Sequence, residues 1–310
     1  MTVYTKLTEI EGLVTAAGLD LDALSLIVSE ALDEDLGGRG VLPPTAGAGL
    51  DITSYATIPA SDTAHAKFVV RQPGTVAGLP VAGYTVATVC SAAGDFELGL
   101  HAADGDQVAR GDVLITVVGN TRALLRAERV ALNLITMMSG VATATRAWVD
   151  ALAGTNTRVR DSRKTIPGLR MLQKYAVRIG GGINHRMSLA DAALIKDNHV
   201  IAAGGVVPAY RAVRQSFPGV PIEVEVTSSE QAREVIEAGA TEVLLDNMTV
   251  PEMATIVTEL GDRATFEASG GLTIENATEV AQTGVNFVAV GAITHSAPLL
   301  DIALDFASEN

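Results

Sequence analysis

The sequence predicts an α/β fold in two parts, a compact α+β region followed by a (β/α) barrel of about six strands. A chain of 310 residues provides for about two domains. After residue 153, short apolar runs alternate with helical segments, and this alternation indicates parallel strands joined by helical crossovers. Because no glycine-rich dinucleotide fingerprint follows any of these runs, a barrel is favoured over an open doubly wound sheet.

The first part begins with an amphipathic helix. Asp20 is a good N-cap for the apolar positions that follow at helical spacing, and Gly37 and Gly38 end the pattern. Residues 37–49, rich in glycine and proline, are typical of a loop. The other elements expected here are strands at 65–70 and 113–118 and a helix at 80–91.

The second part follows a bridge at 121–153 that predicts one long helix or two shorter ones. We expect a domain boundary at the start of this bridge, giving domains 1–124 and 125–310, with the C-terminal tail packing on the first domain. The predicted strands of the second domain are 159–163, 193–197, 222–226, 242–246, 265–269 and 286–290.

Composition excludes several classes of protein. With 48% hydrophobic and 19% charged residues, the chain has little charge to cover the surface of a monomer, so we expect an oligomer. A net charge of −14 argues against binding to nucleic acid or to an anionic membrane. The first residues do not resemble a signal peptide, and the longest uncharged run, between Arg71 and Asp95, holds two prolines and four glycines and so does not predict a membrane span.

The single cysteine, Cys90, cannot form an intrachain disulfide and has no Cys or His neighbour at metal-ligand spacing. This suits a reducing compartment, so we expect a cytoplasmic protein. A buried structural thiol is the favoured interpretation of Cys90, ahead of a nucleophile.

Positive charge is concentrated in one segment. Residues 158–214 hold eleven Lys or Arg and three acids, a local balance of 11 − 3 = +8, so the remainder carries −14 − 8 = −22. A basic segment inside an acidic chain predicts one site for a small, strongly anionic ligand. The alternative is a set of solvated helix faces.

Polar residues follow the predicted barrel strands at the edge where barrel active sites form. They are Arg163, Lys164, Lys196, Glu225, Asp246, Ser269 and Gly291. A charged side chain in an apolar strand is costly when buried without a partner, so each must face a partner, water or a ligand. A Lys196–Glu225 ion pair could be purely structural, but charge at four strand ends favours a site.

The mixture of signs indicates the ligand. Glu225 and Asp246 offer oxygen ligands for Mg²⁺ or for the hydroxyls of a sugar. The glycine-containing turns at 268–273 and 290–296 are each expected to open a helix whose backbone N–H groups favour phosphate oxygens. A phosphate bridged by a metal fits both features.

Three further basic residues have roles that the sequence leaves open. His185 and Arg186 lie on a predicted loop between the first two barrel strands, where a structural histidine and a carboxylate-binding pair are both possible. Arg129 lies on the bridging helix and could be a surface residue or a site residue.

Six segments of the second part are distinctive: DSRKTIPGLR (161–170), GGGINHRMSLADAALIKDNH (180–199), EVEV (223–226), LLDNM (244–248), EASGGL (267–272) and VGAITHSAP (290–298). Together they resemble one family, the carboxylating nicotinate-nucleotide pyrophosphorylases, also called quinolinate phosphoribosyltransferases. The resemblance extends over almost the whole chain, with two departures: Ser162 stands where the family usually has Thr, and residues 37–49 are an insertion.

The resemblance implies an N-terminal α/β sandwich domain followed by an open (β/α) barrel, a homodimer in which Arg129 enters the partner's site, Mg²⁺, and no organic cofactor. Quinolinate binding is implied for Arg129, Arg163, His185, Arg186 and Lys196. Binding of 5-phosphoribosyl 1-pyrophosphate is implied for Lys164, Glu225, Asp246, Ser269, Gly270, Gly271, Val290, Gly291 and Ala292. Ser162 and His295 are also expected to bind substrate, without assignment to one of the two. Catalytic roles are expected for Lys164, Lys196, Glu225 and Asp246, with Glu225 and Asp246 meeting Mg²⁺ directly or through substrate.

Three alternatives remain. A nicotinate phosphoribosyltransferase without decarboxylation is disfavoured because a substrate with one carboxylate needs fewer cations. A biotinyl or lipoyl carrier is suggested by DGDQVARGDV (104–113), but no Lys occurs between Lys67 and Lys164 to carry the group. A family-like protein associated with metal-oxyanion transport is disfavoured because Arg129, His185 and Arg186 are all present.

Overall fold

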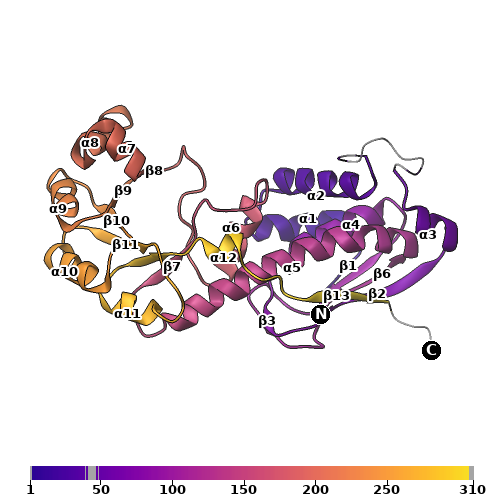
Figure 1. Cartoon of the computed structure of the whole chain (residues 1–310). Helices are drawn as coiled ribbons and strands as arrows, with labels where there is room; N and C mark the ends of the chain where they lie inside the picture. Colours follow the sequence, from indigo (N-terminus) through magenta and orange to yellow (C-terminus); the bar gives the residue numbers. More distant parts are fainter. Residues whose placement is uncertain (1, 39, 41–46, 48, 307–310) are drawn as a thin grey trace. The chain divides into compact units, whose positions relative to one another are not determined.

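The computed structural model describes residues 2–38, 40, 47 and 49–306, which form two compact units (Figure 1). The first comprises the described residues of Met1–Thr143, Pro167–Gly180 and Ala297–Asn310, and the second comprises Ala144–Ile166 and Gly181–Ser296. Most of the expected 37–49 loop lies outside the described residues.

The first unit is built on an antiparallel sheet of five strands in the order β1-β4-β6-β2-β13. The strands expected at 65–70 and 113–118 are β2 and β6, neighbours in this sheet. The last strand comes from the far end of the chain and pairs with β2. The bounds are β1 Thr2–Tyr4, β2 Thr63–Val70, β4 Glu97–Leu100, β6 Val113–Asn120 and β13 Ile302–Phe306, with a small ribbon of β3 Gly74–Thr75 and β5 Gln107–Val108.

Helix α4 (Leu79–Ser91) is the core element of the first unit and confirms the helix expected at 80–91. It contacts β4 and β6 on one side and α1 on the other (Figure 1). The Asp104 carboxylate accepts hydrogen bonds from the backbone N–H groups of Gly78 and Leu79, both at 2.9 Å, which fixes where the helix begins. The other helices are α1 Leu7–Ala16, α2 Leu21–Asp35, α3 Ile52–Thr57 and α6 Arg170–Ile179.

The bridging segment is one continuous helix, α5 (Thr121–Ala151). The expected boundary between residues 124 and 125 falls within its first turn, whereas the two units divide the chain at Thr143. The units also differ from two consecutive domains because residues 167–180, which include α6, belong to the first unit.

The second unit contains six parallel strands in the order β7-β12-β11-β10-β9-β8. The first strand pairs with the last, and β7 and β8 are the two ends of the sheet order, so the expectation of an open six-stranded barrel is confirmed. The bounds are β7 Arg158–Arg160, β8 Ala193–Ile195, β9 Ile222–Val226, β10 Glu242–Asp246, β11 Thr265–Ser269 and β12 Phe287–Ala289.

Helices alternate with these strands and cover the sheet on its outer side (Figure 1). Their bounds are α7 Asp197–Ala203, α8 Val206–Ser216, α9 Ser229–Glu237, α10 Val250–Leu260, α11 Ala277–Gln282 and α12 Ala292–His295. Val224 and Val226 on β9 are fully buried, as expected for strand positions facing these helices. The alternate positions Glu223 and Glu225 therefore face the barrel interior.

None of the described helices combines the length and the apolarity needed to cross a membrane. The structural interpretation of Cys90 is confirmed: its side chain is buried in the first unit, and burial raises the pKa of the thiol to about 12. The thiolate needed for nucleophilic chemistry is therefore scarce at neutral pH.

Gly140 allows a close approach within the first unit. An ideal Cβ at this position of α5 would overlap the carbonyl oxygen of Pro298 and lie 3.1 Å from the Cα of Leu299. Because backbone cannot rotate aside as a side chain can, Gly140→Ala should lower the free energy of unfolding by about 1 to 3 kcal/mol. The measurement is the melting temperature, which should fall.

Gly12→Ala is the matched control. Gly12 lies within helix α1, and a Cβ at this position would meet only open space, so alanine should raise stability by about 0.5 to 1 kcal/mol through helix propensity. Equal effects of the two substitutions would show that the segment at Pro298 does not constrain α5.

Candidate active site

A cavity of about 780 Å³ lies at the carboxyl ends of the strands in the second unit. Among its lining residues are all the expected site residues that belong to this unit: Ser162, Arg163, Lys164, His185, Arg186, Lys196, Glu225, Asp246, Ser269, Gly270, Gly271, Val290, Gly291, Ala292 and His295. Arg129 is exposed and lies on α5 in the first unit.

Four basic side chains converge on the cavity, Arg163, Lys164, Arg186 and Lys196. The Nε of Arg163 is buried and has no hydrogen-bond partner among the residues that the structure describes. Burial lowers the pKa of Arg186, and the positive charge of Arg163 lowers it further. A cavity that brings like charges together and leaves a donor unused is suited to an anion.

Lys196 and Glu225 form an ion pair, with 3.2 Å between Nζ and Oε2. Lys196 is half exposed toward the cavity, whereas Glu225 is buried. Strand β8 ends at Ile195, one residue before Lys196, so Lys196 is the N-cap of α7 rather than a strand residue as expected.

Two buried or hydrogen-bonded carboxylates shape the loop that carries Arg186. The Asp161 carboxylate is fully buried and accepts from the backbone N–H of His185 at 2.8 Å. The Asp191 carboxylate accepts from the N–H groups of Met187 and Ser188 at 2.7 and 2.8 Å, and the hydrogen bonds to it lower its pKa to about 2 despite the opposing effect of desolvation. The loop is therefore held at both ends.

Glycine creates room where the loops after β7 and β12 meet. A Cβ at Gly291 would lie 2.9 Å from Lys164 Cδ and 3.4 Å from both His295 Nε2 and Ser162 Oγ. The Thr294 hydroxyl donates to the carbonyl oxygen of Lys164 at 2.7 Å. The absent side chain thus lets three polar groups approach the backbone at the end of β12.

The expectation that each glycine turn opens a helix is wrong for the turn at 268–273. Gly270 and Gly271 have φ of +87° and +61°, and α11 begins only at Ala277. Left-handed backbone cannot continue into a right-handed helix, so the chain makes a further turn through Asn276. The second turn leads into α12, which has four residues.

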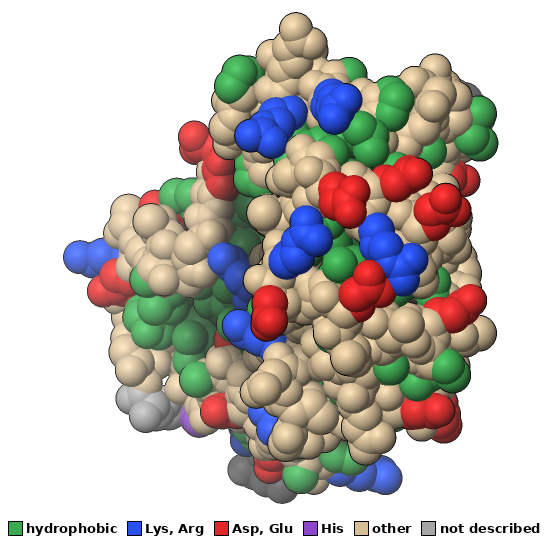
Figure 2. All heavy atoms as spheres, turned by 90° about the vertical axis from the view of Figure 1, so that its left-hand side faces the viewer, with side chains coloured by type: hydrophobic (Ala, Val, Ile, Leu, Met, Phe, Trp, Pro, Cys, Tyr) green, Lys and Arg blue, Asp and Glu red, His purple; other side chains and the backbone are tan. Residues whose placement is uncertain are grey.

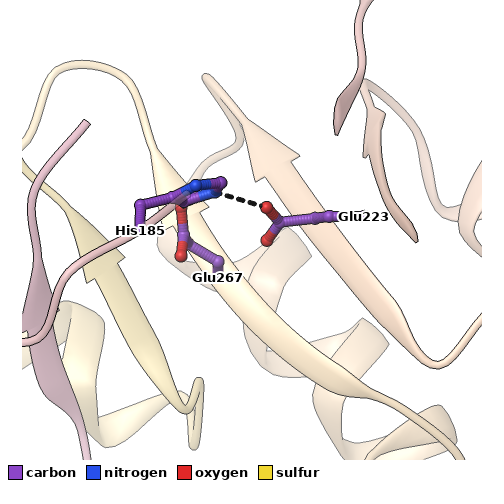
Figure 3. A group of neighbouring side chains, drawn as sticks. All are labelled: His185, Glu223 and Glu267. Carbon is purple, nitrogen blue, oxygen red and sulfur yellow. Dashed lines mark hydrogen bonds and ion pairs between the residues drawn. The ribbon is translucent and has the colours of Figure 1, made fainter. Parts of the chain in front are cut away.

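A buried charged cluster beneath the cavity was not predicted. His185 Nε2 lies 2.6 Å from Glu223 Oε2 and 3.9 Å from Glu267 Oε1 (Figure 3). The Arg160 guanidinium lies 2.8 Å from Glu267 Oε2 and 3.9 Å from Glu223 Oε1. The period-2 placement of Glu223 and Glu225 in IEVEV was the signal that could have revealed it, because both side chains must point into the barrel.

Basic side chains do not form a continuous surface on the face shown in Figure 2, where Lys and Arg lie among Asp and Glu. The basic residues of the segment 158–214 are likewise spread over several elements and do not all reach the cavity. Arg170 and Arg178 lie on α6 in the first unit, and Arg211 and Arg214 lie on α8. The cavity thus receives part of the segment: Arg163, Lys164, Arg186 and Lys196.

Similarity to known proteins places this open parallel barrel, with its cavity at the carboxyl ends of the strands, among the phosphoribosyltransferases. The family model for the quinolinate phosphoribosyl transferase C-terminal domain matches residues 141–305, and the family model for the N-terminal domain matches residues 51–139. The chain belongs to the quinolinate phosphoribosyltransferase family.

Named relatives agree with this assignment. Over 92% of the chain, it is 47% identical to the nicotinate-nucleotide pyrophosphorylase [carboxylating] of Mycobacterium leprae, covering 98% of that protein. It is 37% identical to the mitochondrial quinolinate phosphoribosyltransferase [decarboxylating] 2 of Nicotiana glauca over 99% of the chain and 89% of that protein. The solved nicotinate-nucleotide pyrophosphorylase of Francisella tularensis aligns with a TM-score of 0.84 at 33% identity, covering 92% of this chain and 96% of that one.

The cluster predicts a pH dependence of stability. Desolvation, followed by the charge of Glu223, raises the pKa of Glu267 to about 7. A carboxyl whose pKa is higher in the folded than in the unfolded state stabilises the fold at low pH, and this contribution is lost as pH rises through about 7. Between pH 5 and pH 8, the free energy of unfolding of the wild type should fall by on the order of 1 to 3 kcal/mol relative to that of Glu267→Gln.

Urea unfolding of both proteins at the two pH values measures this difference. A stability difference that stays constant, or that grows in favour of wild type as pH rises, would contradict the raised pKa.

Proposed function

We propose that the cavity binds quinolinate and 5-phosphoribosyl 1-pyrophosphate and transfers the phosphoribosyl group to quinolinate with decarboxylation. The products are nicotinate mononucleotide, pyrophosphate and CO₂, in the biosynthesis of NAD. The observation that carries the proposal is the convergence of Arg163, Lys164, Arg186 and Lys196 on one cavity, with an unused buried donor on Arg163. Both substrates are small polyanions, so several cations are needed to hold them together.

In this reaction the pyridine nitrogen of quinolinate attacks the anomeric carbon and the bond from that carbon to the pyrophosphate oxygen breaks. Arg163, Arg186 and Lys196 would hold the two carboxylates of quinolinate, and Lys164 would neutralise charge that develops on the departing pyrophosphate. The 2-carboxylate then leaves as CO₂, and the bonding electron pair stays on C2, where the adjacent cationic nitrogen stabilises it. A proton from water then adds to C2. No organic cofactor is required for these steps.

Glu225 and Asp246 are the proposed carboxylates around the ribose. Both line the cavity at the ends of neighbouring strands, and their oxygens are the donor type that Mg²⁺ prefers when phosphates complete its coordination. They would hold the ion directly or through substrate. When bound, Mg²⁺ would neutralise diphosphate charge. The carboxylates would also orient the ribose hydroxyls and stabilise positive charge at the anomeric carbon.

Incubation with quinolinate, 5-phosphoribosyl 1-pyrophosphate and Mg²⁺ tests the proposal directly. Nicotinate mononucleotide and CO₂ should appear in equal amounts, because each transfer releases one carboxylate. Nicotinate in place of quinolinate is the matched control, and it should react far more slowly because it lacks the 2-carboxylate that the cations bind. Faster turnover of nicotinate would favour the non-decarboxylating alternative.

Neutral amides at the two carboxylates should chiefly impair the phosphoribosyl donor. We expect Glu225→Gln and Asp246→Asn to raise the KM for 5-phosphoribosyl 1-pyrophosphate and the Mg²⁺ concentration needed for half-maximal rate, because both lose a charged oxygen ligand. Initial rates over a grid of substrate and Mg²⁺ concentrations measure this. If only the KM for quinolinate changed, the two residues would have to be reassigned to the pyridine site.

A homodimer would place Arg129 in the partner's site. The support is the low charge content of the chain, the exposed position of Arg129 on α5, and its place outside the unit that contains the cavity. A basic residue that the site requires and that another unit carries can come from a second copy. We place this dimer in the cytoplasm, since the chain has a single cysteine, Cys90, which is buried and cannot form an intrachain disulfide.

Mixing two inactive variants tests the shared site. After Arg129→Ala and Lys164→Ala are refolded together, half of the sites in each mixed dimer should contain both wild-type residues. Random pairing therefore restores about a quarter of wild-type activity. Mixed dimers verified by mass that remain inactive would assign Arg129 to its own chain or remove it from catalysis.

A further inference from the structure

His185 lines the cavity, but both of its ring nitrogens are already engaged by the protein. The backbone N–H of Arg186 donates to Nδ1 at 2.7 Å. Since a backbone N–H can only donate, Nδ1 carries no proton, and the proton of the neutral ring lies on Nε2. That N–H points to Glu223 Oε2 at 2.6 Å (Figure 3).

The acceptor Glu223 is itself held rigidly. It lies on β9 between two paired strands and is 5% exposed. Arg160, stacked 4.0 Å above the ring of Phe287, lies 3.9 Å from Glu223 and 2.8 Å from Glu267. We call Arg160, His185, Glu223 and Glu267 the barrel network. It gives the imidazole a fixed orientation because its hydrogen-bond acceptor is part of the sheet.

The orientation of the imidazole matters because it holds the backbone of Arg186. The backbone N–H of His185 donates a hydrogen bond to the Asp161 carboxylate, which fixes the position of the His185 backbone. Its ring then receives the next N–H of the chain, and the Arg186 guanidinium is directed further by a hydrogen bond from Nη1 to the carbonyl oxygen of Ala192 at 2.9 Å. The direction in which Arg186 enters the cavity thus depends on the ring.

We propose that Glu223 is a positioning residue for quinolinate binding, which acts through the His185 ring on Arg186, and that His185 contacts the substrate through neither ring nitrogen. This assignment rests on the proposed function. It differs from the expectation that His185 binds quinolinate directly, because a neutral imidazole has one donor and one acceptor and both are used.

A metal ion held by His185, Glu223 and Glu267 is the competing interpretation, since one ligand atom from each lies within 4.8 Å of the others. The Arg160 guanidinium already forms an ion pair with Glu267 and lies near Glu223, and a metal ion would have to displace the Nε2 proton of His185. The hydrogen-bonded network accounts for the same atoms without a second cation.

Two matched pairs of variants test the assignment. Gln and Met have similar length, but only Gln keeps an acceptor, so Glu223→Gln retains the contact to His185 and Glu223→Met removes it. Asn and Leu have similar shape, but only Asn keeps an acceptor near the position of Nδ1, so His185→Asn can still receive the Arg186 N–H and His185→Leu cannot. Glu242→Met, on the neighbouring strand and outside the cavity lining, is the control.

Glu223→Met and His185→Leu should each raise the KM for quinolinate about tenfold, while the KM for 5-phosphoribosyl 1-pyrophosphate stays within about twofold. Glu223→Gln and His185→Asn should raise the KM for quinolinate no more than about threefold. Circular dichroism and melting temperature show which variants fold. If Glu223→Met does not fold, the His185 pair decides.

The positioning role would be overturned if the two variants of a pair raised the KM for quinolinate equally. It would also be overturned if the KM for quinolinate and the KM for 5-phosphoribosyl 1-pyrophosphate rose by the same factor. Restoration of the wild-type KM for quinolinate in the apolar variants by Zn²⁺, added at saturating Mg²⁺, would favour the metal interpretation and overturn the positioning role. An inactive wild type would overturn the proposed function and this assignment together. An active wild type with unchanged KM in both apolar variants would overturn this assignment alone.

Discussion

Several cations must be held close together at one end of the barrel without an anion always present, and this electrostatic constraint governs the second unit. Burial lowers the pKa of Arg186 and the positive charge of Arg163 lowers it further, because like charges repel most strongly where water is excluded. Carboxylates at strand positions that face the barrel interior compensate part of this positive charge. Glu225 pairs with Lys196 at the cavity, whereas Glu223 and Glu267 pair with His185 and Arg160 beneath it. The site is thus a layer of partly uncompensated cations above a layer of paired charges.

The buried cluster of Arg160, His185, Glu223 and Glu267 reduces the stability of the folded protein. Two carboxylates face one arginine, so burial and mutual repulsion raise the pKa of Glu267, and one of its oxygens has no hydrogen-bond partner among the described residues. Such an arrangement lowers stability at neutral pH but fixes side-chain directions, since Arg160, Glu223 and Glu267 are held from strands. A loop residue such as Arg186 gains a defined direction from that layer through a single histidine ring.

The first unit is governed by close packing instead of charge. Helix α4 is buried almost throughout its length between sheet and helix, and α5 approaches the segment at Pro298 so closely that only glycine fits at position 140. Strand β13 completes the sheet from the end of the chain, so residues far apart in sequence share one core. This explains why a division into two consecutive segments at residue 124 differs from the two compact units.

The sequence alone determined the elements whose signals are local. Asp20 caps the helix that follows it, the six apolar runs are the six barrel strands, and the charges at their ends line one cavity. Parallel strands bring their carboxyl ends to one edge, so the strand-end members of the site followed from position in the strands. The binding roles of the loop residues His185 and Arg186 were implied by the family resemblance. Only the tertiary structure decided which groups pair: Glu223 with His185, Glu267 with Arg160, and His185 with the backbone of its neighbour. These partners lie up to 107 residues apart and are selected by register and side-chain direction, which hydrophobic periodicity does not encode.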